Sequence, residues 1–82
     1  MGCLIVLKSI TYAQRASGVL SRLRIPLGII KPPVSLGKGS CSYALKIKYS
    51  DMKKAVEAVR AANIPISGVY TLEEGFYREV RA

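Results

Sequence analysis

The sequence contains no histidine and only two cysteines, Cys3 and Cys41, among its 82 residues. Without imidazole, a histidine-based metal site and Ser–His or Cys–His catalysis are both excluded, and two cysteines cannot form a zinc knuckle. A disulfide scaffold of this length would normally carry about four to eight cysteines. We therefore expect no enzymatic activity and no metal or other cofactor, and we expect both cysteines to be reduced thiols.

Long apolar runs are also missing. Cys3–Leu7 is the longest near the start, far short of the roughly 18 residues of a membrane helix, and no basic signal-peptide region precedes it. The sequence thus predicts an unprocessed cytoplasmic protein that does not enter a membrane. Its length allows one domain, and its 50% content of hydrophobic residues is enough for a folded core.

Acidic residues are absent from residues 1–48, so the whole formal charge of +8 lies there, while residues 49–82 are neutral. This asymmetry favours an anionic partner, either nucleic acid, an acidic protein surface or a small anion. Simple solubilisation by surface charge is the alternative.

Hydrophobic periodicity predicts four strands and two helices. The first helix begins at Ser9 or Thr11, whose hydroxyl can cap it, and the second begins at Ser50. In chain order we expect strand Leu4–Leu7, helix Ile10–Leu23, strand Leu27–Lys31, strand Tyr43–Tyr49, a helix from Ser50 to Asn63, and strand Ile66–Leu72.

The two halves of the chain resemble each other, since Arg24-Ile25-Pro26 is echoed by Asn63-Ile64-Pro65. Two βαβ halves combine most simply into an α+β ferredoxin-like fold, βαββαβ. This predicts a four-stranded antiparallel sheet of order 4-1-3-2 with both helices on one face. Residues 1–72 would form this single domain and residues 73–82 a polar tail. The first strand is apolar on both faces, so its uncovered face could pair with a second copy.

In this fold the Cys41 loop lies beside the beginning of the first helix. A helix N-terminus and nearby lysines favour the thiolate, so we expect a lowered pKa and an exposed sulfur at Cys41. The residues expected to stabilise a thiolate or bound anion are Ser9, Thr11, Gly37, Lys38, Gly39, Ser40 and Ser42. Cys3 lies at the opposite end of the sheet, where we expect it to pack as a small hydrophobe and form no disulfide with Cys41. The alternative is that Cys41 has no functional role and is simply a small residue that precedes a strand.

From Leu4 to Leu72 the sequence resembles the selenium/sulfur (Se/S) carrier protein-like family of small bacterial domains. Four segments carry this resemblance. They are Ser9-Ile10-Thr11, Arg24-Ile25-Pro26, Ser40-Cys41 before Ala44-Leu45-Lys46, and Ile64-Pro65 before Gly68-Val69-Tyr70. The resemblance implies that Cys41 holds sulfur or selenium as a persulfide or selenopersulfide and passes it between donor and acceptor proteins. Family members usually have Cys-Gly where this chain has Cys41-Ser42, and glycine tolerates backbone angles that serine disfavours.

A nucleic-acid-binding module is the main rival, because RNA-recognition domains share this topology and residues 1–48 are basic. Their third strand carries stacking aromatics, however, where this chain has Ser40 and Ser42. Only salt-sensitive attraction to phosphates would remain. A regulatory interaction module of the same fold is a further alternative.

Overall fold

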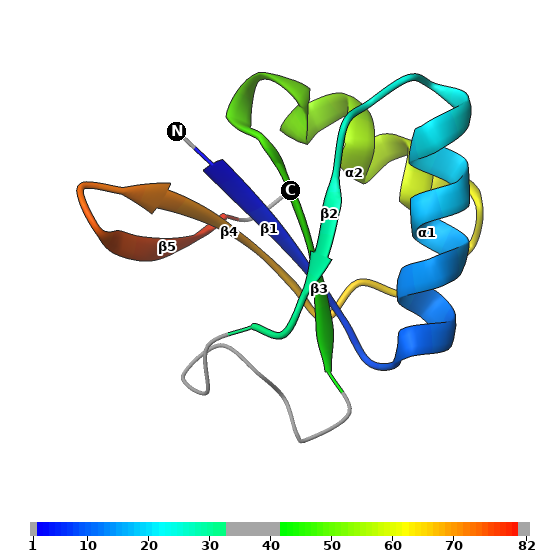
Figure 1. Ribbon diagram of the computed structural model, residues 1–82, viewed down its shortest axis with the longest axis horizontal. Coiled ribbons are helices and arrows are strands. Elements are labelled where there is room, and N and C mark those ends of the chain that lie inside the picture. The colour runs from blue at the N-terminus through cyan, green and yellow to red at the C-terminus, as the bar shows by residue number, and fades with distance from the viewer. Residues whose placement is uncertain (1, 33–41, 81–82) are drawn as a thin grey trace.

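Two helices pack on one face of an antiparallel sheet in the computed structural model, which describes residues 2–32 and 42–80 (Figure 1). This confirms the predicted α+β class. No helix in these residues is long and apolar enough to span a bilayer. In chain order the elements are β1 Gly2–Leu7, α1 Ile10–Arg22, β2 Gly28–Ile30, β3 Tyr43–Lys48, the 3-10 helix η1 Tyr49–Asp51, α2 Met52–Ala61, β4 Gly68–Glu73 and β5 Phe76–Val80.

The sheet has five strands in the order β2-β3-β1-β4-β5. The predicted order 4-1-3-2 is therefore incomplete, because β5 adds to the free edge of β4. Both residues of the connecting turn, Glu74 (φ 49°) and Gly75 (φ 85°), have positive φ. Such a two-residue turn matches the twist of antiparallel strands and directs the chain back along β4. Residues 76–80 thus form a strand where the sequence predicts a polar tail.

β1 lies at the centre of the sheet and is buried on both faces. Cys3, Ile5 and Leu7 point to the helices, and Leu4 and Val6 to the other face. Buried residues of both helices and of β3 and β4 add to the helix-side core, namely Ala13, Ala16, Leu20, Ala55, Val56, Val59, Leu45, Ile47 and Val69. Their three- and four-residue spacing in the helices is the amphipathic pattern that predicts these helices.

The face of the sheet opposite the helices is also buried at its centre. Leu4 is 2% and Val6 0% exposed, and both pack with Ala44, Tyr70 and the half-buried Ile30. The predicted homodimer required these β1 side chains to be exposed. They offer no apolar surface for a second copy to cover, so that reason for a dimer is removed.

Both helices end in the same way, which explains why similar tripeptides, Arg24-Ile25-Pro26 and Asn63-Ile64-Pro65, follow them. Arg24 (φ 59°) and Asn63 (φ 60°) adopt the left-handed conformation after α1 and α2. The next amides, of Ile25 and Ile64, donate to Leu20 at 3.1 Å and to Val59 at 3.3 Å. These bonds define Schellman motifs, in which an apolar residue after the helix folds back onto its last turns. Ile25 and Ile64 are both buried, so each motif closes one end of the core.

α1 begins at a side-chain cap. Ser9 is extended (φ −153°, ψ 163°), and its hydroxyl accepts a hydrogen bond from the Tyr12 amide at 3.3 Å. Of the two predicted caps, Ser9 is therefore the correct one, and Thr11 lies exposed in the first turn. Ser50 is not the cap of α2, because it lies inside η1. Asp51 precedes α2 without a side-chain capping bond.

Ser9→Ala is expected to lower the free energy of unfolding by about 1 kcal/mol, because the Tyr12 amide loses its acceptor. Urea unfolding followed by circular dichroism measures this. Thr11→Ala is the matched control and should change stability by less than about 0.5 kcal/mol, since its side chain is on the surface. Equal effects of the two substitutions would contradict the capping role of Ser9.

Candidate functional site

The end of β1 lies beside the beginning of β3. Leu7, the last residue of β1, is paired with Tyr43, the first of β3. Lys8 and Ser9 therefore follow β1 next to the point where Ser42 leads into β3, as the predicted topology requires. Ser42 is buried. The other predicted loop residues, Gly37, Lys38, Gly39, Ser40 and Cys41, lie outside the described residues.

Backbone amides at the start of α1 supply hydrogen-bond donors to this end of the sheet. The first intrahelical bond runs from Ala13 to the Ser9 carbonyl at 3.0 Å, and Tyr12 is satisfied by the Ser9 hydroxyl. The amides of Ile10 and Thr11 precede these bonds, so they have no carbonyl partner within the helix. Together with the helix dipole they favour an anion at this position. The Ser9 hydroxyl is engaged as the cap of the helix, accepting from the Tyr12 amide.

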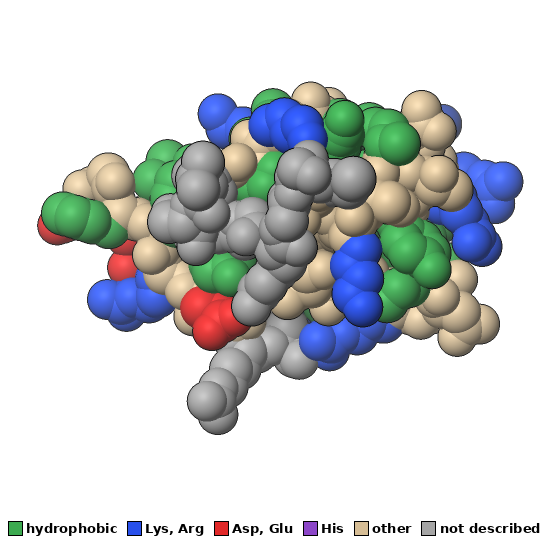
Figure 2. Space-filling model, turned by 90° about the horizontal axis from the view of Figure 1, so that it is seen from below, with side chains coloured by type: hydrophobic (Ala, Val, Ile, Leu, Met, Phe, Trp, Pro, Cys, Tyr) green, Lys and Arg blue, Asp and Glu red, His purple; other side chains and the backbone are tan. Residues whose placement is uncertain are grey.

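The charges around this end are positive. Lys8 is exposed directly after β1, and the Lys31 ammonium lies 4.4 Å from the centroid of the Tyr43 ring. Figure 2 shows Lys and Arg side chains spread over this end of the molecule, with the acidic side chains at one side of it. Glu73, Glu74 and Glu79 belong to the β4–β5 hairpin. The electrostatic potential near Ser42 therefore comes mainly from cations and the helix N-terminus.

A buried hydroxyl flanks the same end of β1 on its other side. The Ser67 amide donates to the Val6 carbonyl at 2.8 Å, while the Ser67 hydroxyl is buried without a hydrogen-bond partner in the described part of the chain. Ser67 and Ser42 lie on opposite sides of β1, two strand spacings or about 10 Å apart. The sequence analysis did not select Ser67, because a lone serine before a strand has no distinctive pattern.

Cys3 is at the opposite end of β1 and is unsuited to sulfur exchange. It is paired with Ile47 and Thr71, its side chain is 1% exposed, and it is a free thiol. Burial in the apolar core raises the pKa of Cys3 from 9.0 to about 11, because a thiolate there would lose its hydration. The structure thus confirms that Cys3 packs as a small hydrophobe.

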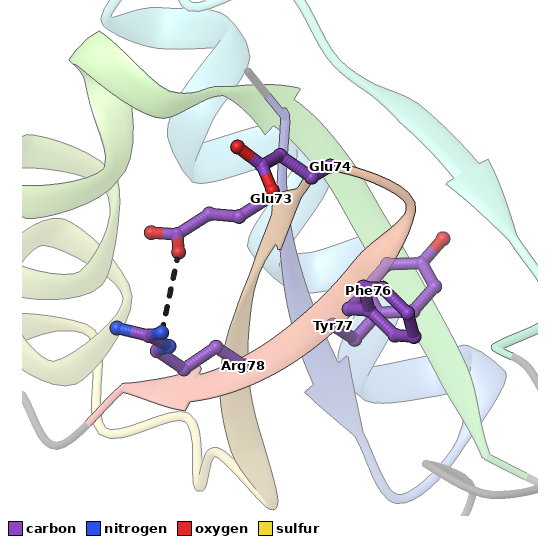
Figure 3. A pocket seen from close by; sticks show the side chains of 5 residues that line it. All are labelled: Glu73, Glu74, Phe76, Tyr77 and Arg78. Atoms are coloured by element: carbon purple, nitrogen blue, oxygen red, sulfur yellow. Dashed lines mark ion pairs between the residues drawn. The ribbon is translucent and has the colours of Figure 1, made fainter.

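A hollow of about 820 Å³ lies at the β4–β5 hairpin, which the sequence analysis did not predict. It is lined by Glu73, Glu74, Phe76, Tyr77 and Arg78 (Figure 3). Arg78 forms an ion pair with Glu73 at 3.7 Å, and in Figure 3 this pair and the two aromatic rings extend to different sides of β5. The hollow contains no nucleophilic thiol, and no three His, Cys, Asp or Glu side chains among residues 2–32 and 42–80 are grouped to bind a metal.

The central strands offer little for stacking nucleic-acid bases. Tyr70 is the aromatic residue of β4 on the face away from the helices, and it is only 8% exposed because it packs on Leu4, Val6 and Ala44. Its ring edge also lies 2.9 Å from the position that a Cβ atom at Gly68 would take. A ring held in this way cannot present its face to a base, as stacking requires.

The family model described as "Putative Se/S carrier protein-like" matches residues 2–71, from the start of β1 through most of β4. No curated protein and no solved structure matches the chain. The matched region includes both strands and the helix start that meet at Ser42. It ends before all of the residues that line the hairpin hollow.

Proposed function

The chain belongs to the Se/S carrier protein-like family, and from this premise we propose that it carries sulfur or selenium on Cys41. Membership of this family is the observation that supports the proposal most directly. Cys41 immediately precedes Ser42 in the sequence, and Ser42 lies beside the cationic start of α1. The other cysteine is buried with a raised pKa, which leaves Cys41 as the carrier thiol. The protein would act as a stoichiometric carrier and not as an enzyme.

Loading would proceed by exchange between a thiolate and a persulfide. The Cys41 thiolate attacks the outer sulfur of a donor persulfide, R–S–SH. A bond forms between Cys41 Sγ and that sulfur, the donor S–S bond breaks, and its electron pair leaves on the donor as R–S⁻. The product is Cys41–S–SH, which keeps the proton of the transferred sulfur. An acceptor thiolate then attacks the outer sulfur in the same way, and a donor R–S–SeH would load selenium equivalently.

The positive end of the sheet would favour both charged forms of Cys41. A thiolate and a deprotonated persulfide are anions. The amides of Ile10 and Thr11, which precede the first intrahelical bond, provide donors, and the Lys8 and Lys31 side chains provide positive charge. A thiol in such surroundings has a pKa below its ordinary value of about 8.5. Its thiolate would therefore be well populated near neutral pH.

Intact mass spectrometry tests the proposal. After incubation with a small persulfide donor and removal of excess reagent, the wild-type protein is expected to gain the mass of one sulfur atom, and Cys41→Ser none. Reduction with dithiothreitol should remove the added sulfur, since the exchange is reversible. Cys3→Ala is the matched control and should load like the wild type, because the Cys3 thiol is buried. Sulfur retained in Cys41→Ser or never gained by the wild type would contradict the proposal.

A basic nucleic-acid-binding module is the second candidate, supported by the charge of +8. It predicts steeply salt-dependent binding of single-stranded RNA that Cys41→Ser leaves unchanged. The buried ring of Tyr70 weighs against base-stacked binding. Sub-micromolar RNA affinity together with no sulfur loading would favour this candidate over the carrier.

A further inference from the structure

A second hollow lies between α1 and the end of α2, away from the sheet end where Ser42 enters β3. Its volume is about 380 Å³. The chain that leaves α2 runs alongside α1 in Figure 1, and the two helices are in contact. The lining residues are Gln14, Arg15, Gly18, Val19 and Arg22 of α1, with Ala62 and Ile64 from the segment that ends α2.

Gly18 opens this hollow at the middle of α1. A glycine inside a helix costs about 0.5–1 kcal/mol relative to alanine. Packing does not explain this cost, because a Cβ atom at Gly18 would meet nothing within 4 Å. The missing side chain leaves the helix backbone exposed, so another backbone can approach α1 closely at this position.

Arg15 and Arg22 flank Gly18 on the same side of α1. The spacing of three and four residues places all three on one helix face, and seven residues separate the two guanidinium groups by about 10.5 Å along the axis. Within the described residues neither arginine forms an ion pair. Arg22 lies in the last turn, where the helix dipole favours a cation, whereas Arg15 lies in the middle of α1, away from that end.

We propose that this hollow, the Arg15–Gly18–Arg22 notch, is a docking site for an acidic amphipathic helix of a partner protein. Two carboxylates spaced by two turns on the partner would meet Arg15 and Arg22, because their spacing equals that of the arginines. An apolar side chain between them would enter the notch above Gly18 and contact Val19 and Ile64. No cysteine is among the lining residues of the notch, so binding there does not require the sulfur chemistry.

The lining of the notch favours a protein over a nucleic acid. Its inner wall is aliphatic, with Val19, Ala62 and Ile64, and no aromatic side chain lines it. The two guanidinium groups at the rim can stack on a base, but the inner wall offers no aromatic plane, and aliphatic residues over a glycine suit the close approach of a second helix. The two arginines alone would attract phosphates and carboxylates equally.

Fluorescence anisotropy with a designed peptide tests the proposal. The probe is a labelled acidic helix of about 16 residues, with two glutamates two turns apart around a central leucine. At about 0.15 M salt, Arg15→Glu combined with Arg22→Glu is expected to weaken binding at least tenfold. The matched control is Lys53→Glu combined with Lys54→Glu, which changes the net charge equally on the exposed first turns of α2. It should weaken binding less than about threefold.

Gly18→Gln separates the notch from general folding effects. Glutamine favours helix more than glycine, so this variant should unfold at a higher temperature, while its side chain fills the notch and weakens peptide binding about fivefold or more. The proposal is overturned by a wild type that does not bind the peptide, by equal losses in the two charge-reversed variants, or by unchanged binding to Gly18→Gln. Tighter binding of single-stranded RNA with the same sensitivity to these variants would assign the notch to nucleic acid instead.

Discussion

In the Cys41→Ser variant Cys3 is the only cysteine. In this variant, iodoacetamide is expected to alkylate Cys3 of the folded protein at least about 100-fold more slowly than Cys3 of the unfolded protein. The thiolate is the reactive form, and raising the pKa from 9.0 to about 11 lowers its fraction near neutral pH about 100-fold. Burial of the side chain also blocks the reagent. Because the folded pKa is raised, the folded-state rate should keep rising with pH toward about 11.

Mass spectrometry of samples quenched over time measures both rates, with the unfolded sample prepared in urea. The matched control is a triple variant, in which Ser21→Cys places a thiol on the surface of α1 and Cys3→Ala and Cys41→Ser remove the two native thiols. That thiol should react in the folded protein almost as fast as in urea, since Ser21 is exposed. Fast alkylation of folded Cys3 would show that β1 opens readily and would make Cys3 a competing carrier thiol.

Leu20→Ala is expected to lower the free energy of unfolding by about 2–5 kcal/mol. Leu20 is 0% exposed in the helix-side core and belongs to the Schellman motif that ends α1. Truncation removes buried apolar area and leaves a cavity that the surrounding core fills only in part. A domain of this size has about 5–10 kcal/mol of stability in total, so the loss is a large fraction.

Urea unfolding at equilibrium measures the effect, and Leu23→Ala at the C-cap of the same helix is the control. Leu23 is 46% exposed, so the same truncation should cost less than about 1 kcal/mol. The backbone bond from the Leu23 amide to the Leu20 carbonyl at 3.0 Å is unchanged by either substitution. Similar losses at the two positions would contradict the assignment of Leu20 to the core.

The buried Cys3 thiol and the proposed carrier thiol illustrate how position decides cysteine chemistry. Cys3 lies within β1, the central strand of the sheet, and Cys41 precedes Ser42 in the sequence. Cys3 points into the core, where desolvation raises its pKa, whereas Ser42 leads into β3 beside a helix N-terminus and two lysines. Burial of Cys3 keeps its thiol away from exchange, so under the proposed function a persulfide on the other cysteine would not be lost to an internal disulfide.

β5 is the element that the sequence analysis did not predict. Its side chains are almost all exposed, including Phe76 at 77%, so its hydrophobic pattern has no clear period of two. The strand exists because Glu74 and Gly75 form a tight turn and β4 offers a free edge. The conformation of this turn and the pairing with β4 depend on the rest of the fold, and the local sequence of residues 73–82 does not indicate them. The prediction of a polar tail was wrong and the predicted strand order was incomplete for this one reason.

The notch on α1 could not be predicted from the sequence either. Arg15, Gly18 and Arg22 share a helix face by spacing alone, but the spacing does not show that Ala62 and Ile64 form the other wall. That wall depends on the packing of α1 against α2 and on the Schellman motif that returns Ile64 to the core.

The sequence by itself determined the elements whose side chains repeat in step with the backbone: the buried strand β1, the alternating strand β3, both amphipathic helices and their Ile-Pro exits. It also determined the uneven charge and the absence of histidine, which depend on composition alone. Only the tertiary structure decided the fifth strand, the residues that cover Leu4 and Val6 on the second face, and the raised pKa of Cys3. Each of these depends on which residues distant in the chain come into contact, and local periodicity carries no information about that.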